Sequence, residues 1–256
     1  MMILYGKVKN KVNNYQCGLI IFYQFSFIIF SGDRVMISYL IYGFLYGAAI
    51  PFMARRFAKF MPATPANALW QLIKFNRFLP QVYSCKEFKR FAWRSFMSAV
   101  IVAILTYLFA AVLGGGNTGW SIFFLWTLLL LAEIDWRMYL LPDILTVPLL
   151  IGGFAYSGLG NGWIIPAESS LGAIVGYFLP VIIGFLLLPR NKNAFGGGDI
   201  KLLAAIGAWV GIVPLLYVIS SASVLMLLYT LLSGRKEVAF GPALALSAIG
   251  VAILFF

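Results

Sequence analysis

Two acidic side chains in an otherwise apolar chain are the residues best suited to chemistry. Asp135 follows the apolar run FFLWTLLLLAEI, and Asp199 lies between Phe-Gly-Gly-Gly and the apolar run IKLLAAIGAWV. The chain has only eight acids. An ionisable residue at the edge of the hydrocarbon layer of a membrane is costly, so it marks a candidate functional site. The simpler explanation for a single acid is that it marks the point where a helix leaves the membrane.

A pair of carboxylates offers a specific chemistry that one alone does not. Two carboxylates in a site of low dielectric cannot easily both ionise, so one pKa rises and the pair shares a proton. Aspartic proteolysis requires this state. One carboxylate takes a proton from water while the other donates one to the scissile carbonyl. We therefore interpret Asp135 and Asp199 as a candidate catalytic pair.

Gly196, Gly197 and Gly198 come directly before Asp199. Three consecutive residues without a Cβ permit unusual backbone angles and the close approach of another chain. We predict an active-site loop whose exposed backbone pairs with an extended substrate segment. The alternative is a flexible loop before a helix, with Asp199 as the helix N-cap.

The composition excludes several other chemistries. The sequence has no histidine, which removes Ser-His-Asp and Cys-His catalysis and any His-ligated metal. Its two cysteines, Cys17 and Cys85, form no CxxC pair, so neither a disulfide framework nor a four-cysteine zinc site is predicted. We attribute the net charge of +11 to the positive-inside bias of a bacterial-type membrane protein. Nucleic-acid binding is not expected, because the basic residues lie in loops between apolar runs.

The hydropathy predicts an all-α, polytopic transmembrane helix bundle in a lipid bilayer. The 256 residues are 62% hydrophobic and 11% charged, whereas soluble domains carry about 25% charged residues. Stretches of roughly 20 apolar residues, enough to cross a bilayer, recur along the chain. A shorter run at 17–31 would add a ninth span. The eight predicted spans are 36–54, 95–113, 119–134, 144–160, 169–188, 200–213, 215–232 and 240–256, and the short sixth span is expected to end at Gly211–Pro214.

Loop charges predict the orientation. The loop 55–94 is rich in Lys and Arg and holds a single acid, Glu87, so we place it in the cytoplasm. Alternation then places Asp135 and Asp199 on the cytoplasmic face as well. The basic residues of the later loops on that face agree: Arg137, Arg190, Lys192, Arg235 and Lys236.

Three segments of the chain resemble the signatures of type IV prepilin peptidases. The segment IDWRMYLLPDILTVPLL (134–150) is similar to their first signature, and FGGGDIKLLAAIGAWVG (195–211) to their GxGD signature. The late segment VAFGPALAL (238–246) is similar to their final helix. The resemblance covers residues 36–256, and the first two segments carry most of its specificity.

The resemblance implies an aspartic endopeptidase of the bacterial cytoplasmic membrane. Such enzymes remove the basic leader of type IV prepilins or type II secretion pseudopilins at the cytoplasmic face. Asp135 and Asp199 match the catalytic pair, and no cofactor is expected for proteolysis. Pro142 and Asp143 are expected to start a helix. Lys201 is expected either to bias the pair electrostatically or to extend to the interface. The supporting motif positions are Pro142, Asp143, Lys201 and Pro242.

The first cytoplasmic loop departs from the family pattern. Many members carry two CxxC pairs there and N-methylate the trimmed pilin with S-adenosylmethionine, whereas the loop 55–94 holds only Cys85. We expect a degenerate methyltransferase-like region and leave methylation, with S-adenosylmethionine as its cofactor, open. The predicted organisation is an N-terminal extension at 1–35, a membrane part at 36–113 and an aspartic peptidase membrane domain at 114–256.

Two alternatives remain open. Pro242-Ala243-Leu244 reads PAL, a motif of presenilin and signal-peptide-peptidase proteases, which also use GxGD. A cut between a basic leader and the apolar segment favours prepilin processing, and a cut within the segment favours this alternative. The chain could instead be a transporter or a non-enzymatic scaffold whose acids relay protons. Proton-coupled flux without peptidase activity would favour that interpretation.

Overall fold

The computed structural model describes residues 36–58, 85–113, 118–160, 162–187, 196–234 and 238–256. Every regular element in these ranges is an α-helix, which confirms the predicted all-α bundle. The helices are Met36–Ala58, α3 (Cys85–Val112), α4 (Thr118–Met138), α5 (Asp143–Gly158), α6 (Pro166–Leu187), α7 (Gly197–Val210), α8 (Ile212–Ser233) and α9 (Gly241–Phe255).

Helix length and composition identify a multi-pass membrane protein. Five described helices are long and apolar enough to cross a bilayer: Met36–Ala58, α3 from Lys89 onward, α4, α6 and α8. Helices suit this solvent because they satisfy their backbone hydrogen bonds internally. The other three helices are shorter. Of these, α7 has only 14 residues, and all of Leu202–Val210 is buried. It therefore forms the centre of the bundle.

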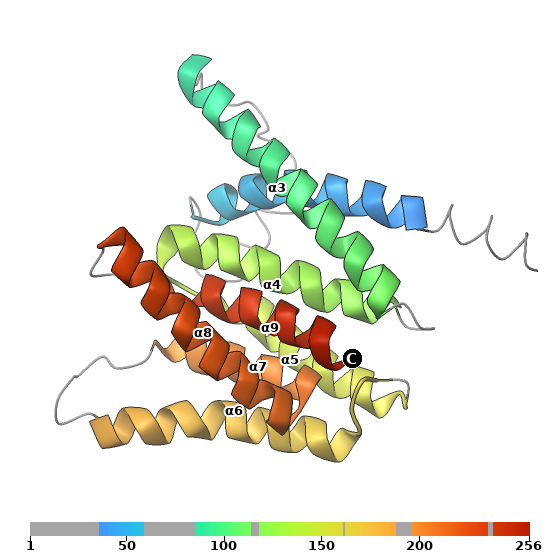
Figure 1. The fold of residues 1–256 in the computed structure, drawn as a ribbon, viewed down its shortest axis with the longest axis vertical. Helices are drawn as coiled ribbons and strands as arrows, with labels where there is room; N and C mark the ends of the chain where they lie inside the picture. Colours follow the sequence, from blue (N-terminus) through green and yellow to red (C-terminus); the bar gives the residue numbers. More distant parts are fainter. Residues whose placement is uncertain (1–35, 59–84, 114–117, 161, 188–195, 235–237) are drawn as a thin grey trace, which may run out of the picture.

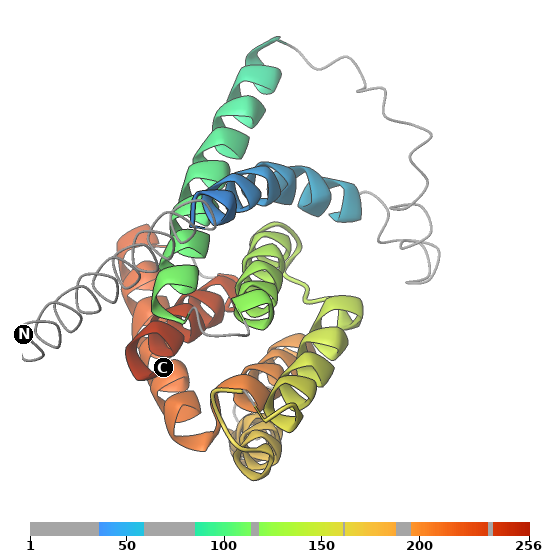
Figure 2. The ribbon, with the colours of Figure 1, turned by 90° about the vertical axis from the view of Figure 1, so that its right-hand side faces the viewer.

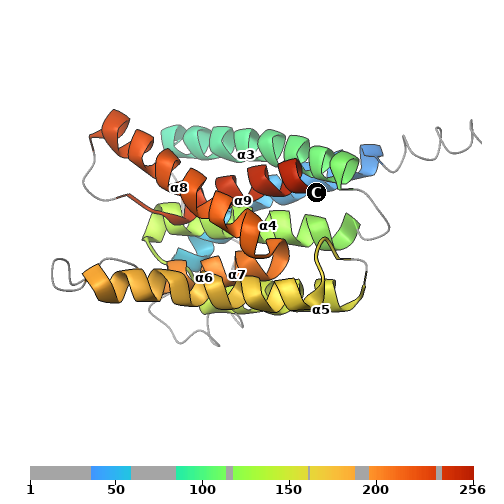
Figure 3. The same cartoon turned by 60° about the horizontal axis from the view of Figure 1, so that its bottom comes forward.

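Successive helices run in alternating directions, so the helix ends that carry Asp135 and Asp199 lie at the same end of the bundle. The C-terminal ends of α4, α6 and α8 and the N-terminal ends of α5, α7 and α9 share one end of the bundle, on the left in Figure 1. We call this the Asp135 end. Figure 2 shows the helix Met36–Ala58, in blue, beside α3 and away from α5, α6 and α7. Figure 3 shows α3 along one side and α5 with α6 along the other.

The core is built around Trp209 of α7, which is fully buried. Its indole N–H donates a hydrogen bond to the carbonyl oxygen of Leu149 in α5, at 2.8 Å. Its ring lies 5.0 Å from that of Phe124 and 5.3 Å from that of Tyr156. A Cβ on Gly153 would come within 2.9 Å of the Trp209 ring, so a glycine is needed for α5 to approach α7 this closely.

Glycines also set the contact between α6 and α7. Gly172 faces Gly207, and a Cβ built on either residue would collide with the carbonyl oxygen of the other. Beside this crossing, the Ser169 hydroxyl donates to the carbonyl oxygen of Ala208 at 2.6 Å. Small residues permit such close helix approach in membranes, where apolar burial alone does not drive association. The crossing fixes α7, and with it Asp199, relative to α6.

The helices differ from the predicted spans at several ends. The first two described helices both extend into the predicted loop 55–94, to Ala58 and from Cys85. α7 ends at Val210, earlier than predicted, because Gly211 adopts a φ of +79°. Pro214 does not end α7. It lies in the first turn of α8, where its missing N–H has no intrahelical partner to lose.

Some predictions fall outside the described residues. These are the short run 17–31, the extension 1–35, and the basic residues Arg190, Lys192, Arg235 and Lys236.

Candidate active site

Asp135 lies in the last turn of α4, and not in a loop beyond it. It is buried, with 4% of its surface exposed. The helix ends at Met138, and the next residue, Tyr139, adopts a left-handed conformation with a φ of 54° and donates its N–H to the carbonyl oxygen of Asp135 at 2.9 Å. A non-glycine residue in this conformation costs about 1–2 kcal/mol. Strain of this kind is often concentrated at functional sites.

The Asp135 carboxylate is held by the start of α9. Its Oδ2 accepts a hydrogen bond from the backbone N–H of Gly241, at 2.8 Å. Gly241 is the first residue of α9, where backbone N–H groups have no partner within the helix and the helix dipole favours negative charge. A Cβ on Gly241 would lie 2.7 Å from the same Oδ2, so only glycine permits this contact. The charge on Asp135 is thus stabilised from one side.

Asp199 lies in the first turn of α7. The N-cap of this helix is Gly196, so the alternative that Asp199 itself is the N-cap is wrong. None of the three glycines adopts the unusual backbone angles that glycine permits, because none has a positive φ. Gly196 is extended, with φ −69° and ψ 134°, and Gly197 and Gly198 are already helical.

The three glycines have different surroundings. A Cβ on Gly196 would lie 3.0 Å from Oδ2 of Asp199, so the carboxylate folds back over this residue. A Cβ on Gly198 would lie 2.9 Å from the Cβ of Leu141, in the segment that links α4 to α5. Gly197 is exposed and has no atom within 4 Å of its Cβ position. Gly198 therefore brings the first turn of α7 against the chain that follows Asp135.

The two carboxylates interact electrostatically. Asp199 lies outside the five segments that are long enough to cross the membrane. Burial, and second the negative charge of Asp135, raise the pKa of the Asp199 carboxyl to about 7. Near neutral pH, Asp199 therefore carries a proton about half of the time, while Gly241 stabilises the charge on Asp135. The two carboxyl groups therefore have different surroundings. Such a difference lets one group act as an acid and the other as a base.

Asp143 and Lys201 form an ion pair between two helices. α5 begins at Asp143, with Pro142 as its N-cap. The Lys201 ammonium donates to both carboxylate oxygens of Asp143, at 2.7 Å each. The sequence suggested electrostatic bias of the catalytic pair or extension to the interface for Lys201, and neither describes this contact. The pair holds the start of α5 against the first turn of α7.

Glu133, the remaining acid near Asp135, is also neutralised. Arg137 donates to it from Nε at 2.8 Å, and Arg94 of α3 lies 3.5 Å from the same oxygen. In the described part of the chain, ion pairs thus account for Glu133 and Asp143, but not for Asp135 or Asp199. Of the four acids that lie at the Asp135 end in the described residues, the two predicted to react are therefore the two without an ion pair.

Gly241 is a site residue that the sequence patterns did not single out. The signal was the Gly-Pro pair in VAFGPALAL, since proline is common in the first turn of a helix and the preceding glycine leaves its N–H accessible. Only Pro242 was predicted as a motif position. It occupies the first turn of α9 and lies next to the residue that contacts Asp135.

Known proteins resemble the half of the chain that contains this site. Residues 122–231 match the type IV leader peptidase family. A prepilin leader peptidase/N-methyltransferase of Dickeya chrysanthemi is 40% identical over 132 residues, which are 48% of this chain and 46% of that protein. A protein of the same name in Aeromonas salmonicida is 35% identical over 161 residues, which are 57% of this chain and 55% of that protein.

A protein of the same name in Dichelobacter nodosus is 38% identical over 135 residues, 51% of this chain and 47% of that protein. The chain thus spans about half the length of the curated relatives that it matches. No solved structure matches it significantly.

Proposed function

We propose that this protein is a membrane aspartic endopeptidase with Asp135 and Asp199 as its catalytic pair, because residues 122–231 match the type IV leader peptidase family. The substrate is a type IV prepilin or a type II secretion pseudopilin, and the reaction removes its basic leader. The observation that carries this proposal is the meeting of two acids without neutralising cations at one end of the bundle, with Asp199 raised in pKa to about 7.

The different surroundings of Asp135 and Asp199 give the two carboxyl groups different roles in the reaction. Asp135, whose charge the Gly241 N–H stabilises, takes a proton from the attacking water. Asp199, which retains a proton near neutral pH, donates it to the carbonyl oxygen of the scissile peptide bond. The resulting tetrahedral diol collapses when the proton now on Asp135 passes to the leaving amine. The diol returns a proton to Asp199, so both carboxyl groups recover their starting states.

The orientation is part of the same proposal. The Asp135 end faces the cytoplasm of a bacterial cell, and the helices cross its cytoplasmic membrane. Arg94 and Arg137 lie at this end, as the positive-inside rule requires. The leader of a prepilin would therefore reach the pair from the cytoplasm while its apolar helix remains in the bilayer.

The test compares three substitutions that each replace one carboxyl group with an amide of the same size. Asp135→Asn and Asp199→Asn should each reduce prepilin processing in membranes by about 10²–10⁴-fold, the usual contribution of a general acid or base. Asp143→Asn is the matched control and should retain most activity, because Asp143 pairs with Lys201 on the exposed surface. Full processing by either Asp135→Asn or Asp199→Asn would contradict the mechanism.

Mass spectrometry of the processed product distinguishes the rival protease. We expect a cut between the basic leader and the apolar helix. A cut inside the apolar segment would instead indicate an intramembrane protease of the presenilin or signal-peptide-peptidase type, to which the Pro242-Ala243-Leu244 motif also points.

The same spectrum reports N-methylation of the new N-terminus, for which S-adenosylmethionine would supply the methyl group. The relatives' names include this second activity. The helices on either side of the predicted loop 55–94 are described as far as Ala58 and from Cys85, and most of the loop lies between them. A mass increase of one methyl group on the trimmed pilin would support a retained methyltransferase, and an unmodified N-terminus would support the degenerate region that the missing CxxC pairs predict.

A further inference from the structure

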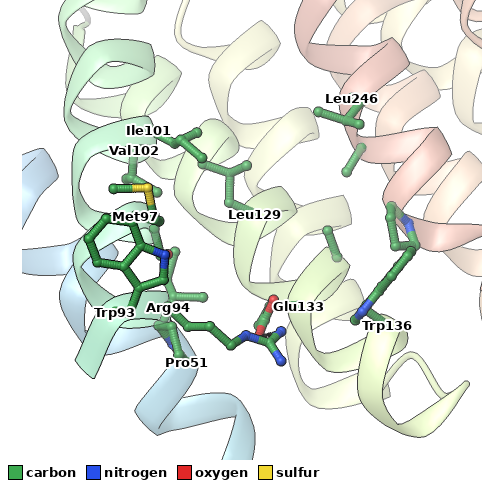
Figure 4. Close-up of a pocket in the computed structure, with 15 residues that line it drawn as sticks. Pro51, Trp93, Arg94, Met97, Ile101, Val102, Leu129, Glu133, Trp136 and Leu246 are labelled. Carbon is green, nitrogen blue, oxygen red and sulfur yellow. Dashed lines mark ion pairs between the residues drawn. The ribbon is translucent and has the colours of Figure 1, made fainter. Parts of the chain in front are cut away.

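A groove of about 440 Å³ lies between α3, α4 and α9, and Ile50 and Pro51 of the helix Met36–Ala58 also line it. Figure 4 shows the α3 side chains Trp93, Met97 and Ile101 along one side and Leu246 of α9 on the other, with Leu129 and Glu133 of α4 between them. We call this the α3–α4–α9 groove.

The lining follows the helical repeat on all three walls. α3 contributes positions between Trp93 and Val102, α4 contributes 129, 132, 133 and 136, and α9 contributes 242, 245 and 246. Residues three and four apart lie on one face of a helix, so each wall presents a continuous stripe. The stripe from Trp93 to Ile101 is about 12 Å long at 1.5 Å per residue. The groove is therefore an elongated trough that follows the helix axes.

One end of the trough adjoins the catalytic pair. Glu133 and Trp136, on either side of Asp135 in the sequence, both line it. Pro242 also lines it and directly follows Gly241, whose N–H contacts Asp135. Asp135 itself turns from this wall toward the start of α9. A chain segment seated in the trough would thus bring its adjoining backbone to the carboxylates.

The chemistry of the lining favours an apolar helix as the occupant. Ile101 and Leu246 are 54% and 57% exposed, and most of the other lining residues are apolar. The charged residues Arg94 and Glu133 lie at the Asp135 end and are paired with each other at 3.5 Å. Exposed apolar side chains are common on membrane helices. This surface differs because it is concave and its lining includes Trp136 and Pro242, the residues that follow Asp135 and Gly241 in the sequence.

We propose that the α3–α4–α9 groove binds the first turns of the substrate's own transmembrane helix, which positions the peptide bond just before that helix at Asp135 and Asp199. This inference rests on the proposed function and adds the surface that selects the substrate. The charged end of the groove marks where the bound helix leaves the apolar layer and becomes extended for cleavage.

Photo-crosslinking tests this assignment directly. A benzophenone amino acid is placed at Ile101 or Leu246 in the groove, and at Ile182 of α6 or Leu228 of α8 as controls of similar exposure on other faces. Membranes containing full-length prepilin are then irradiated. We expect several-fold more crosslinked prepilin from the groove positions. Equal crosslinking at all four positions would overturn the assignment, as would groove adducts to lipid alone that added prepilin does not reduce.

A kinetic measurement separates this inference from the proposed function. Ile101→Trp narrows the groove and should raise KM for prepilin roughly tenfold with little change in kcat, whereas the control Ile182→Trp should change neither. If the wild-type protein cleaves prepilin but both variants match it, the groove assignment fails and the protease assignment stands. If the wild-type protein cleaves no prepilin at all, the proposed function fails, and this inference fails with it.

Discussion

At the scale of single residues, Gly241 is needed for its backbone and for the side chain that it lacks. Its N–H is the one donor to the Asp135 carboxylate among the hydrogen bonds of the described residues, and its Cα faces that carboxylate directly. A Cβ at this position would force the Asp135 side chain or the start of α9 to move.

The variant Gly241→Ala should therefore lower kcat for leader cleavage. The added Cβ would lie 2.7 Å from Oδ2 and 3.0 Å from Cβ of Asp135, so one of them must move. A displacement of about 1 Å at a catalytic group can cost about 10²-fold in rate. Gly250→Ala is the control on the same helix, because nothing lies within 4 Å of its Cβ position, and it should leave the rate unchanged. Equal rates for the two variants would show that the Gly241 contact is not needed.

The raised pKa of Asp199 predicts the pH dependence of cleavage. Asp199 must be protonated to act as the general acid, and burial and the Asp135 charge raise its pKa to about 7. The proton is present below this pH and is lost above it. We expect kcat/KM to fall about tenfold per pH unit once the pH exceeds about 7. Circular dichroism over the same range should show an unchanged fold. A rate that stays constant to about two pH units above this pKa would exclude this role for Asp199.

At the scale of elements, α7 is positioned by the glycine crossing with α6. Gly172→Ala would push a methyl group into the Gly207 carbonyl, and overpacking of this kind typically costs about 1–3 kcal/mol. We expect a lower unfolding temperature in detergent and weaker cleavage, because Asp199 moves with α7. Gly184→Ala, on the same α6 but with no neighbour near its Cβ position, should leave both unchanged. Equal unfolding temperatures of the two variants would indicate that α6 and α7 can move apart at this crossing without a loss of stability.

The sequence predicted the helices better than the contacts between them. Apolar runs predicted where the helices lie, because membrane solvation acts on each segment separately. α4 continues to Met138, one turn beyond the predicted end at 134, and the Arg137–Glu133 pair lies at this end of the helix. The Gly241 contact with Asp135 and the Lys201 pair with Asp143 join residues far apart in the chain, so no local pattern could predict them. Asp135 and Asp199 could be singled out as candidates because charges are rare in such an apolar chain, whereas Gly241 is one of 25 glycines.

At the scale of the whole molecule, the alternation of helix directions makes α5 a marker of orientation. Leu140 lies just before α5 at the Asp135 end, and Leu159 lies just after it at the opposite end. Both side chains are exposed, at 44% and 61%. In the proposed orientation the Asp135 end, where Arg94 and Arg137 lie, faces the cytoplasm. Cysteines at these two positions should therefore face opposite sides of the membrane.

The measurement uses a membrane-impermeant maleimide and a background in which Cys17 and Cys85 are replaced by serine. In intact bacterial cells, Leu159→Cys should be labelled and Leu140→Cys should be protected. In inverted membrane vesicles the pattern should reverse, and detergent should expose both positions as a control for reactivity. The opposite pattern in cells would place the catalytic pair outside the cytoplasm, where a leader that is still cytoplasmic could not reach it. Labelling of both positions in intact cells would mean that α5 does not separate the two faces, so the site would have to be reached along the bilayer.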